Sequence, residues 1–197
     1  MSKKYESLRD LLIDIEKEFS DEVGFKVKKN GEIIDIKYSK FVEDVKSFGE
    51  YLLNLELSNN RVAFIAPNRY EWAVSYYSVV CGAGLVVPLD KELPASEIAN
   101  LVRRSNAKAI FFSNRKRDLI NSIREEVPNL KYYIELYSDE NELENTFKGE
   151  NHYTFDELLK ISSVENFIVE DLGLVKDSTI KLRENYGFLG SAILQEF

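Results

Sequence analysis

The sequence predicts an α/β fold: a largely parallel sheet flanked by helices, with a small hairpin near the N-terminus. Short apolar segments begin at residues 61, 85, 108 and 131, so their starts are 24, 23 and 23 residues apart. This interval is typical of a strand, a crossover helix and the next parallel strand. Such strands are buried on both faces and should be continuously apolar. The segments VAFIA, LVV and AIFF meet that requirement.

The composition describes one acidic, globular domain. The 197 residues carry 26 Lys and Arg against 34 Asp and Glu, a formal charge of −8 and a pI near 4.9. No dense block of basic residues occurs, which argues against binding to nucleic acid or to an anionic membrane. The single cysteine, Cys81, excludes an internal disulfide framework and predicts a cytoplasmic, reducing compartment. The first twenty residues lack the apolar stretch of a secretory signal.

The N-terminal segment predicts a helix followed by a hairpin. Ser7 opens a capping box, and apolar residues follow it at helical spacing as far as Phe19. Residues 24–38 alternate apolar and polar on either side of Asn30-Gly31. This dipeptide tolerates the positive φ angles of a two-residue turn, so we expect two antiparallel strands there.

After the hairpin, Ser39 is predicted to cap a helix that ends at the polar turn of residues 58–60. Strands and helices then alternate. The expected strands are residues 61–66, 85–87, 108–112 and 131–136, and the expected helices are residues 69–81, 94–105 and 115–127.

Beyond the last of these strands the chain becomes acidic and polar. Residues 138–151 predict an exposed loop, and Thr154 opens another capping box before a short helix. We assign residues 1–160 to an N-terminal subdomain. Residues 161–197 form a tail that is expected to pack on the same domain, because its apolar content argues against disorder.

One uncharged stretch has the length of a membrane span. It covers residues 72–89, eighteen residues in all. Small and helix-breaking residues interrupt it: Ser75, Ser78, Gly82, Gly84 and Pro88. The pattern therefore favours a helix over residues 72–81 and a strand over residues 85–87, with no transmembrane segment.

The residues that commonly carry catalysis are scarce. A single histidine and a single cysteine exclude a histidine-based triad and a zinc site, so no metal site is predicted. His152 lies in a polar turn before a predicted cap, which indicates a solvated loop histidine. Cys81 lies at the apolar end of a predicted helix, which favours core packing over a thiolate nucleophile paired with His152.

Gly82-Ala83-Gly84 resembles part of a dinucleotide-binding turn, but its setting is reversed. Those glycines follow a strand and open a helix, whereas these close a helix and open a strand. We therefore expect glycine to supply a left-handed residue at the helix end. The phosphate loop GxxxxGK[ST] does not occur in the sequence.

The remaining charged and aromatic groups have simpler interpretations. The acidic run could bind a hard cation but is expected to be solvated, because its spacing does not follow a calcium loop; it comprises Asp139, Glu140, Glu142 and Glu144. The basic groups could contact phosphate but are expected to be surface charge; they are Arg103-Arg104 and Arg115-Lys116-Arg117. The aromatic group is expected in the core rather than in a ligand box; it comprises Tyr70, Trp72, Tyr76 and Tyr77.

Residues 61–113 resemble the early part of the adenylate-forming synthetases, particularly the AMP-forming long-chain fatty acid CoA ligases. Asn68, Glu71 and Trp72 match the Asn-x-x-Glu-Trp pattern of that family. Residues 82–90, GAGLVVPLD, match its Ala-Gly-x-x-x-Val-Pro-Leu-Asp signature. The resemblance extends over residues 5–160 and fades in the tail.

The resemblance implies a fold in which this region is the first part of a large N-terminal domain. It also implies a two-step reaction for the complete enzyme. A fatty acid carboxylate attacks the α-phosphate of ATP to give acyl-AMP and pyrophosphate, and the thiol of CoA then displaces AMP. The first step requires a glycine-rich loop, Mg²⁺ and a lysine to stabilise charge on phosphate.

The phosphate loop of that family, Thr-Ser-Gly-Thr-Thr-Gly-x-Pro-Lys-Gly, is expected a few tens of residues after Tyr153. Residues 176–181 read KDSTIK instead, and the family's adenine loop, ribose-binding Asp and C-terminal catalytic Lys have no counterpart. We therefore expect a catalytically incomplete chain, with no catalytic or cofactor-binding residue assigned. The matched positions are interpreted as scaffold: Asn68, Glu71, Trp72, Gly84, Pro88 and Asp90.

Three functions remain open at this point. The first is the N-terminal portion of an acyl-CoA synthetase, whose complete form uses a fatty acid, ATP, Mg²⁺ and CoA. The second is a non-catalytic binding or regulatory module on the same scaffold. The third is an unrelated flavodoxin-like nucleotide-binding domain. A homodimer is also expected, because some members of the resembling family pair through N-terminal segments.

Overall fold

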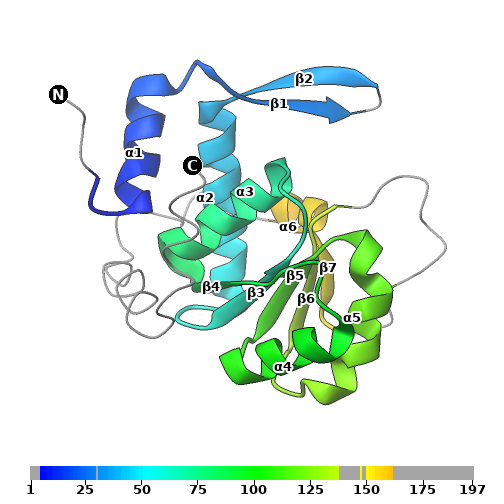
Figure 1. The fold of residues 1–197 in the computed structure, drawn as a ribbon. Helices are drawn as coiled ribbons and strands as arrows, with labels where there is room; N and C mark the ends of the chain where they lie inside the picture. Colours follow the sequence, from blue (N-terminus) through cyan, green and yellow to red (C-terminus); the bar gives the residue numbers. More distant parts are fainter. Residues whose placement is uncertain (1–4, 30, 138–146, 148–149, 162–197) are drawn as a thin grey trace.

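Five parallel strands form the centre of the computed structural model (Figure 1). The structure describes residues 5–29, 31–137, 147 and 150–161. The strands of this sheet lie in the order β4-β3-β5-β6-β7, and β1 and β2 form a separate antiparallel pair. The strands are β1 (Val23–Lys29), β2 (Glu32–Lys37), β3 (Arg61–Ile65), β4 (Leu85–Pro88), β5 (Ala109–Phe112), β6 (Tyr132–Glu135) and β7 (His152–Thr154). The helices are α1 (Leu8–Phe19), α2 (Tyr38–Asn54), α3 (Tyr70–Ser78), α4 (Ala95–Ser105), α5 (Arg117–Ile123) and α6 (Phe155–Ile161).

Helices cover both faces of the five-stranded sheet, as the sequence predicts for a parallel sheet (Figure 1). Helices α2, α3 and α6 pack on one face, and α4 and α5 pack on the other. Alternate residues of one strand serve the two faces: Phe111 of β5 faces α2, whereas Ile110 and Phe112 face α4 and α5. The continuous apolar run of β5 is therefore explained by burial on both sides.

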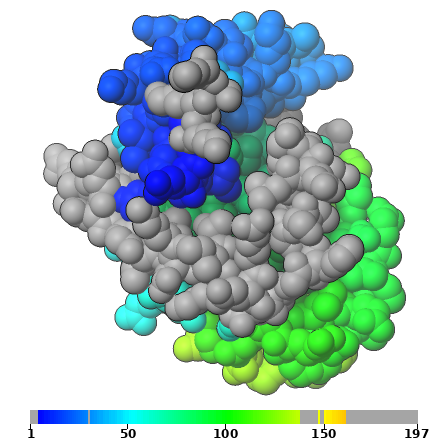
Figure 2. Space-filling model, turned by 60° about the vertical axis from the view of Figure 1, so that its left-hand side comes forward, coloured from blue at the N-terminus to red at the C-terminus, as the bar shows by residue number. Residues whose placement is uncertain are grey.

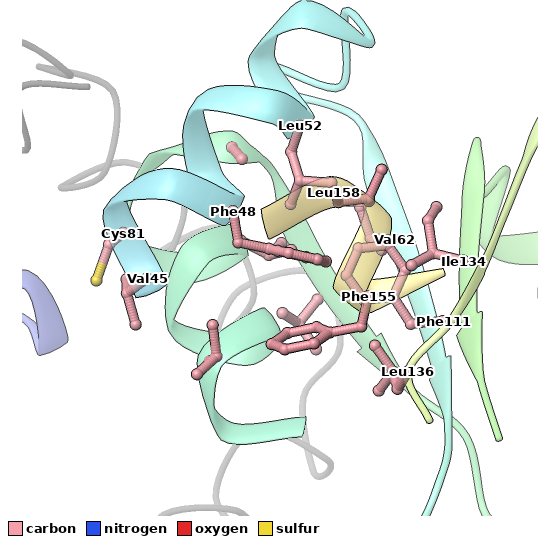
Figure 3. Packing of buried hydrophobic residues seen from close by; sticks show 14 of the residues in the cluster. Val45, Phe48, Leu52, Val62, Cys81, Phe111, Ile134, Leu136, Phe155 and Leu158 are labelled. Atoms are coloured by element: carbon pink, nitrogen blue, oxygen red, sulfur yellow. The ribbon is translucent and has the colours of Figure 1, made fainter. Parts of the chain in front are cut away.

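The larger core lies between α2 and the sheet. Phe48 of α2 is fully buried, with its ring centroid 5.8 Å from that of Phe111 and 5.0 Å from that of Phe155 on α6. Figure 3 shows Phe48 and Leu52 of α2 lying beside Phe155 and Leu158 of α6, next to the strands. These contacts fix α2 and α6 against one face of the sheet.

The first helix begins as the sequence predicts. The Ser7 hydroxyl accepts a hydrogen bond from the Asp10 backbone N–H at 3.1 Å and donates to the Asp10 carboxylate at 2.9 Å. Leu12 is buried, whereas Phe19 in the last turn is 40% exposed. Figure 2 shows α1 and the hairpin at one end of the molecule and the α4–α5 side at the other.

The predicted hairpin is confirmed. β1 and β2 pair from Phe25 opposite Ile36 to Lys29 opposite Glu32. Gly31 in the connecting turn has a φ of 85°, the left-handed conformation that such a turn requires. The ring of Phe25 lies 4.9 Å from that of Phe41 on α2, which anchors the hairpin to the helices.

The predicted capping of α2 by Ser39 is wrong. The helix begins at Tyr38, and no side chain caps it. The backbone N–H groups of Tyr38 and Ser39 donate instead to the carbonyl oxygens of Glu22 and Ser20, at 3.0 and 2.9 Å. The turn between α1 and β1 thus satisfies the free N–H groups, and a capping hydroxyl is not needed. The helix ends at Asn54, before the polar turn at residues 58–60.

The glycines after α3 are not left-handed, contrary to the prediction. The helix expected over residues 69–81 ends at Ser78 and continues as a π turn, Val79–Ala83. Gly82 and Gly84 have φ angles of 161° and 164°, which is extended backbone. Position 84 requires glycine because there is no room for a side chain: a Cβ atom there would lie 2.6 Å from the carbonyl oxygen of Asn60.

Several other expectations are refined. The helix expected over residues 115–127 is α5 flanked by 3₁₀ turns at Asn114–Lys116 and Arg124–Glu126. None of the described helices combines the length and the apolar character needed to cross a lipid bilayer. The tail at residues 162–197 and the acidic run at residues 139–144 lie outside the described residues.

Candidate functional site

The strand order places a topological switch point between β3 and β5. From β3 the chain passes through α3 to β4 on one side, and through α4 it returns to β5 on the other. The two connecting helices cover opposite faces of the sheet, so the chain leaves β3 and β5 in opposite directions at their carboxyl ends. Ligands of open α/β sheets bind at such points. The carboxyl edge is therefore the first candidate site.

Polar residues from three strand ends meet at this carboxyl edge. The guanidinium group of Arg69, which follows β3, lies 4.2 Å from the centre of the Tyr137 ring, which follows β6. Asn114, which follows β5, donates a hydrogen bond from its backbone N–H to the Tyr137 carbonyl oxygen at 3.3 Å. The Asn114 side chain is buried and accepts from the Arg115 N–H at 2.9 Å. These bonds hold the loops after β3, β5 and β6 together.

Glu71 adds a carboxyl group to this region, in the first turn of α3. Burial raises its pKa above the ordinary range, the nearby charge of Asp156 acts in the same direction, and Arg69 and Lys29 lower it in part. A carboxyl with a raised pKa near a strand end is a candidate functional group, although structural groups also show such shifts.

The residues that match the ligase patterns divide into two groups. Trp72 and Gly84 have packing roles: the Trp72 ring stacks on Tyr76 at 4.9 Å, and Gly84 allows the close approach to Asn60. The others lie at the carboxyl ends of β3 and β4. Asn68 is exposed there, and the Asp90 carboxylate accepts a hydrogen bond from the Glu92 N–H at 2.9 Å. Their interpretation as scaffold stays a prediction.

The expected core position of the aromatic group is confirmed in outline. Tyr70, Trp72, Tyr76 and Tyr77 are all partly buried and pack against the larger core. The Tyr70 hydroxyl donates to the Asp44 carboxylate at 2.7 Å, and burial is the first cause that raises the pKa of this phenol. This bond joins α3 to α2.

A second polar cluster joins α5, β6 and β7. Glu135, the last residue of β6, is 1% exposed, and its carboxylate accepts two hydrogen bonds from Arg117. The Nε–Oε2 distance is 2.8 Å and the Nη2–Oε1 distance is 2.7 Å. The Nε2 atom of His152 lies 3.5 Å from Oε2. Burial acts to raise the pKa of Glu135, but His152 and Arg117 outweigh it and hold the pKa below its ordinary range.

This cluster corrects two predictions. His152 is not a solvated loop residue but the first residue of β7, with a side chain 22% exposed. Arg117 is not surface charge, because its side chain is 13% exposed and paired with Glu135. Glu135 carries no signal in the sequence, because a single carboxylate at the end of a short apolar strand belongs to no recognisable motif.

Cys81 and His152 are not brought together. Cys81 packs in the core on the α2 face, whereas His152 lies beside Phe112 on the α5 face. Cys81 is fully buried, and burial raises its pKa to about 12. Its predicted role in core packing is therefore confirmed.

The resemblance implies a Mg²⁺ ion for the complete enzyme. Within the described ranges, no group of three or more His, Cys, Asp or Glu side chains could hold a metal ion. The described residues therefore offer no cage of protein ligands for this ion.

Comparison with known proteins identifies the family. The profile of the AMP-binding enzymes matches residues 18–171. The chain belongs to the AMP-binding enzyme family. The fold agrees, since a mostly parallel sheet with an added hairpin is the architecture of the N-terminal part of the adenylate-forming enzymes.

Named relatives of this AMP-binding family member are CoA ligases. The chain is 27% identical over 126 residues to 4-hydroxybutyrate--CoA ligase 2 of Metallosphaera sedula. That match covers 62% of this chain and 22% of the ligase. A protein of Rhodopseudomonas palustris assigned as a long-chain-fatty-acid CoA ligase superposes with a TM-score of 0.67 at 18% identity. That match covers 82% of this chain and 37% of the other.

A third similar structure is the anthranilate CoA ligase AuaEII in complex with anthranoyl-AMP. The TM-score is 0.63 at 15% identity, and the match covers 83% of this chain and 28% of that one. At such identities the two structures show likeness of fold alone. This chain spans between about a fifth and two fifths of the length of the three relatives.

Proposed function

We propose that this chain is the N-terminal portion of an AMP-forming acid–CoA ligase. The observation that carries the proposal is the family match over residues 18–171, joined to partial coverage of relatives that are CoA ligases. In the complete enzyme, a carboxylate oxygen attacks the α-phosphorus of ATP and pyrophosphate leaves. The sulfur of CoA then attacks the acyl carbon, and AMP leaves.

The contribution of this chain is structural support at the carboxyl edge of its sheet. Arg69, Asn114 and Tyr137 hold the loops after β3, β5 and β6 in fixed positions. A rigid edge of this kind positions loops that carry binding groups. Alone, the chain is expected to be catalytically incomplete, because neither its sequence nor its described part offers the loop that stabilises phosphate charge.

We infer long-chain fatty acids as the substrate class from the sequence resemblance to long-chain fatty acid CoA ligases. The Metallosphaera sedula relative is named for a short hydroxy acid. A series of acids from four to eighteen carbons, tested as substrates of the complete enzyme, distinguishes a preference for long-chain fatty acids from a preference for a short hydroxy acid. Greater kcat/KM for the long acids supports our proposal, and preference for 4-hydroxybutyrate overturns the long-chain assignment.

The decisive first experiment is to sequence the DNA downstream of the codon for Phe197 and translate it in three frames. Thr-Ser-Gly-Thr-Thr-Gly within that DNA is the expected result. The purified 197-residue chain should at the same time show no ATP–pyrophosphate exchange with any acid of the series. Clear exchange by this chain alone would contradict catalytic incompleteness.

A second candidate is a non-catalytic binding module, which the exposed hairpin favours. Ile33 and Ile34 of β2 are 71% and 43% exposed, an unusual exposure for large apolar side chains. If the downstream DNA encodes no phosphate loop, this candidate replaces the first.

A further inference from the structure

The strand β7, residues 152–154, is held to the sheet by few backbone contacts, whereas the α6 helix that follows is packed in the larger core through Phe155 and Leu158. β7 pairs with β6 through three residue pairs, from Tyr133 opposite His152 to Glu135 opposite Thr154. One more bond runs from the Tyr133 N–H to the Asn151 carbonyl oxygen at 3.0 Å. A three-residue strand at a sheet edge forms only a short ladder, so side chains must contribute to its attachment.

The Glu135 carboxylate is placed to make that contribution. Its Oε2 atom faces Arg117 Nε at 2.8 Å on one side and His152 Nε2 at 3.5 Å on the other. At 3.5 Å the second distance is longer than a good hydrogen bond, and His152 Nε2 has no hydrogen-bond partner within the described part of the chain, so the contact attracts as an ion pair when the imidazole is protonated. A single buried carboxylate therefore lies between a helix on one face of the sheet and the edge strand β7.

Aromatic rings shield this arrangement from water. The His152 ring lies 4.8 Å from the Phe147 ring and 6.3 Å from the Phe112 ring. Phe147 in turn lies 5.0 Å from Tyr133, and the Arg124 guanidinium lies 5.3 Å from Phe147. Low local polarity strengthens the attraction between charges and raises the cost of an unpartnered one.

The segment that follows is continuous with β7. Thr154 and Glu157 form the capping box of α6: the Thr154 N–H donates to the Glu157 carboxylate at 2.8 Å, and the Glu157 N–H donates to the Thr154 hydroxyl at 3.3 Å. Thr154 ends β7 and Phe155 begins α6, so release of β7 removes the residue that caps the helix but leaves Phe155 and Leu158 packed in the larger core.

We infer that Arg117, Glu135 and His152 form a latch that fastens β7 to the sheet, so that β7 opens locally when the latch is broken while α6 stays packed in the larger core. The device is conformational: α5 and β6 hold the carboxylate in place, and β7 carries the group that engages it. Exchange of backbone amides reports such local opening directly, because a segment that opens alone exchanges faster than the rest of the sheet.

The test is hydrogen exchange of the 197-residue chain at neutral pH, read by mass spectrometry. His152→Phe keeps an aromatic ring beside Phe147 but removes the nitrogen that faces Glu135. It should raise the exchange rate of peptides that cover residues 150–154 about tenfold, while β3 peptides change by less than about twofold. Glu150→Gln, which removes an exposed carboxylate next to β7, is the matched control and should change neither.

Glu135→Gln provides the second variant and should raise exchange in the same peptides. If that variant unfolds, His152→Phe still tests the latch, because it leaves the Arg117–Glu135 pair intact. Unchanged exchange in His152→Phe would overturn the latch, as would an equal increase in the β3 peptides, which indicates global destabilisation rather than local opening.

Discussion

Gly84 lies against the Asn60 carbonyl oxygen so closely that a Cβ atom on Gly84 would lie 2.6 Å from it. The same Cβ would lie 3.2 Å from the carbonyl oxygen of Leu57. Both neighbours are backbone atoms, which cannot turn aside as a flexible side chain can. The missing side chain at Gly84 therefore lets β4 start beside the turn that precedes β3.

Gly84→Ala is accordingly expected to lower the free energy of unfolding by about 1–3 kcal/mol, the usual cost of overpacking. Urea denaturation followed by circular dichroism measures the change. Lys91→Ala, an exposed substitution beyond the other end of β4, is the control and should alter stability by less than about 0.5 kcal/mol. Equal stability of the glycine and alanine proteins would show that the Asn60 turn moves without cost.

The parallel sheet could be predicted from the sequence because its cause is local and repeated. The strands β3 and β5 are buried on both faces and contain uninterrupted apolar runs, and the crossover helices fix the interval between runs. The capping box at Ser7 was predictable for the same reason, since both partners lie within one turn. Ser39 shows the limit: its expected cap is replaced by the carbonyl oxygens of Ser20 and Glu22, which only the tertiary fold brings near.

The cluster of Arg117, Glu135 and His152 could not be predicted, because its members are far apart in the sequence and none of them lies in a recognisable motif. Arg117 lies in a basic run, Glu135 ends an apolar strand, and His152 lies in a polar stretch. Only the packing of α5 on β6, and of β7 beside it, makes them neighbours. β7 itself is three residues long, too short to show any periodicity.

Phe48 tests the core between α2 and the sheet. Its side chain is fully buried between Phe111 and Phe155, so Phe48→Ala leaves a cavity where three elements meet. We expect a loss of about 3–5 kcal/mol in the free energy of unfolding, measured by urea denaturation. Ile33→Ala at the exposed hairpin is the control and should cost less than about 0.5 kcal/mol. A small loss at Phe48 would mean that the neighbouring rings close the cavity.

Cys81 offers a chemical probe of the same core. Burial leaves its side chain inaccessible and raises its pKa to about 12, so almost no thiolate is present at pH 8. The native protein should therefore resist a thiol reagent such as dithionitrobenzoate, and the urea-unfolded protein should release one equivalent of chromophore rapidly. Because the chain has a single cysteine, all of the released chromophore reports on Cys81. Rapid labelling of the native protein would contradict the burial of this thiol.

The Arg117–Glu135 pair predicts a specific dependence of stability on pH. Burial acts to raise the pKa of Glu135, but His152 and Arg117 hold it below its ordinary value in the folded protein. A folded-state pKa below the unfolded one stabilises the protein at pH values above the unfolded pKa, about 4.3, and this stabilisation is lost as the pH falls through the folded value. Glu135→Gln should therefore be less stable than the parent at pH 7, by about 3–5 kcal/mol if the buried guanidinium loses its partner.

The difference in stability between the two proteins should begin to narrow below about pH 4.3, where the unfolded state starts to bind the proton, and should close only as the pH falls through the lower folded-state pKa of Glu135, when the parent carboxylate becomes protonated as well. Urea denaturation at intervals between pH 7 and pH 3 measures the gap. Glu157→Gln is the comparison: hydrogen bonds from Thr154 are the first cause that lowers the pKa of Glu157, yet that carboxylate lies at the surface, where solvent screens its interactions. The difference in stability between Glu157→Gln and the parent protein should therefore be much smaller at every pH. A gap for Glu135→Gln that stays constant down to pH 3 would show that shape rather than charge at Glu135 stabilises the fold.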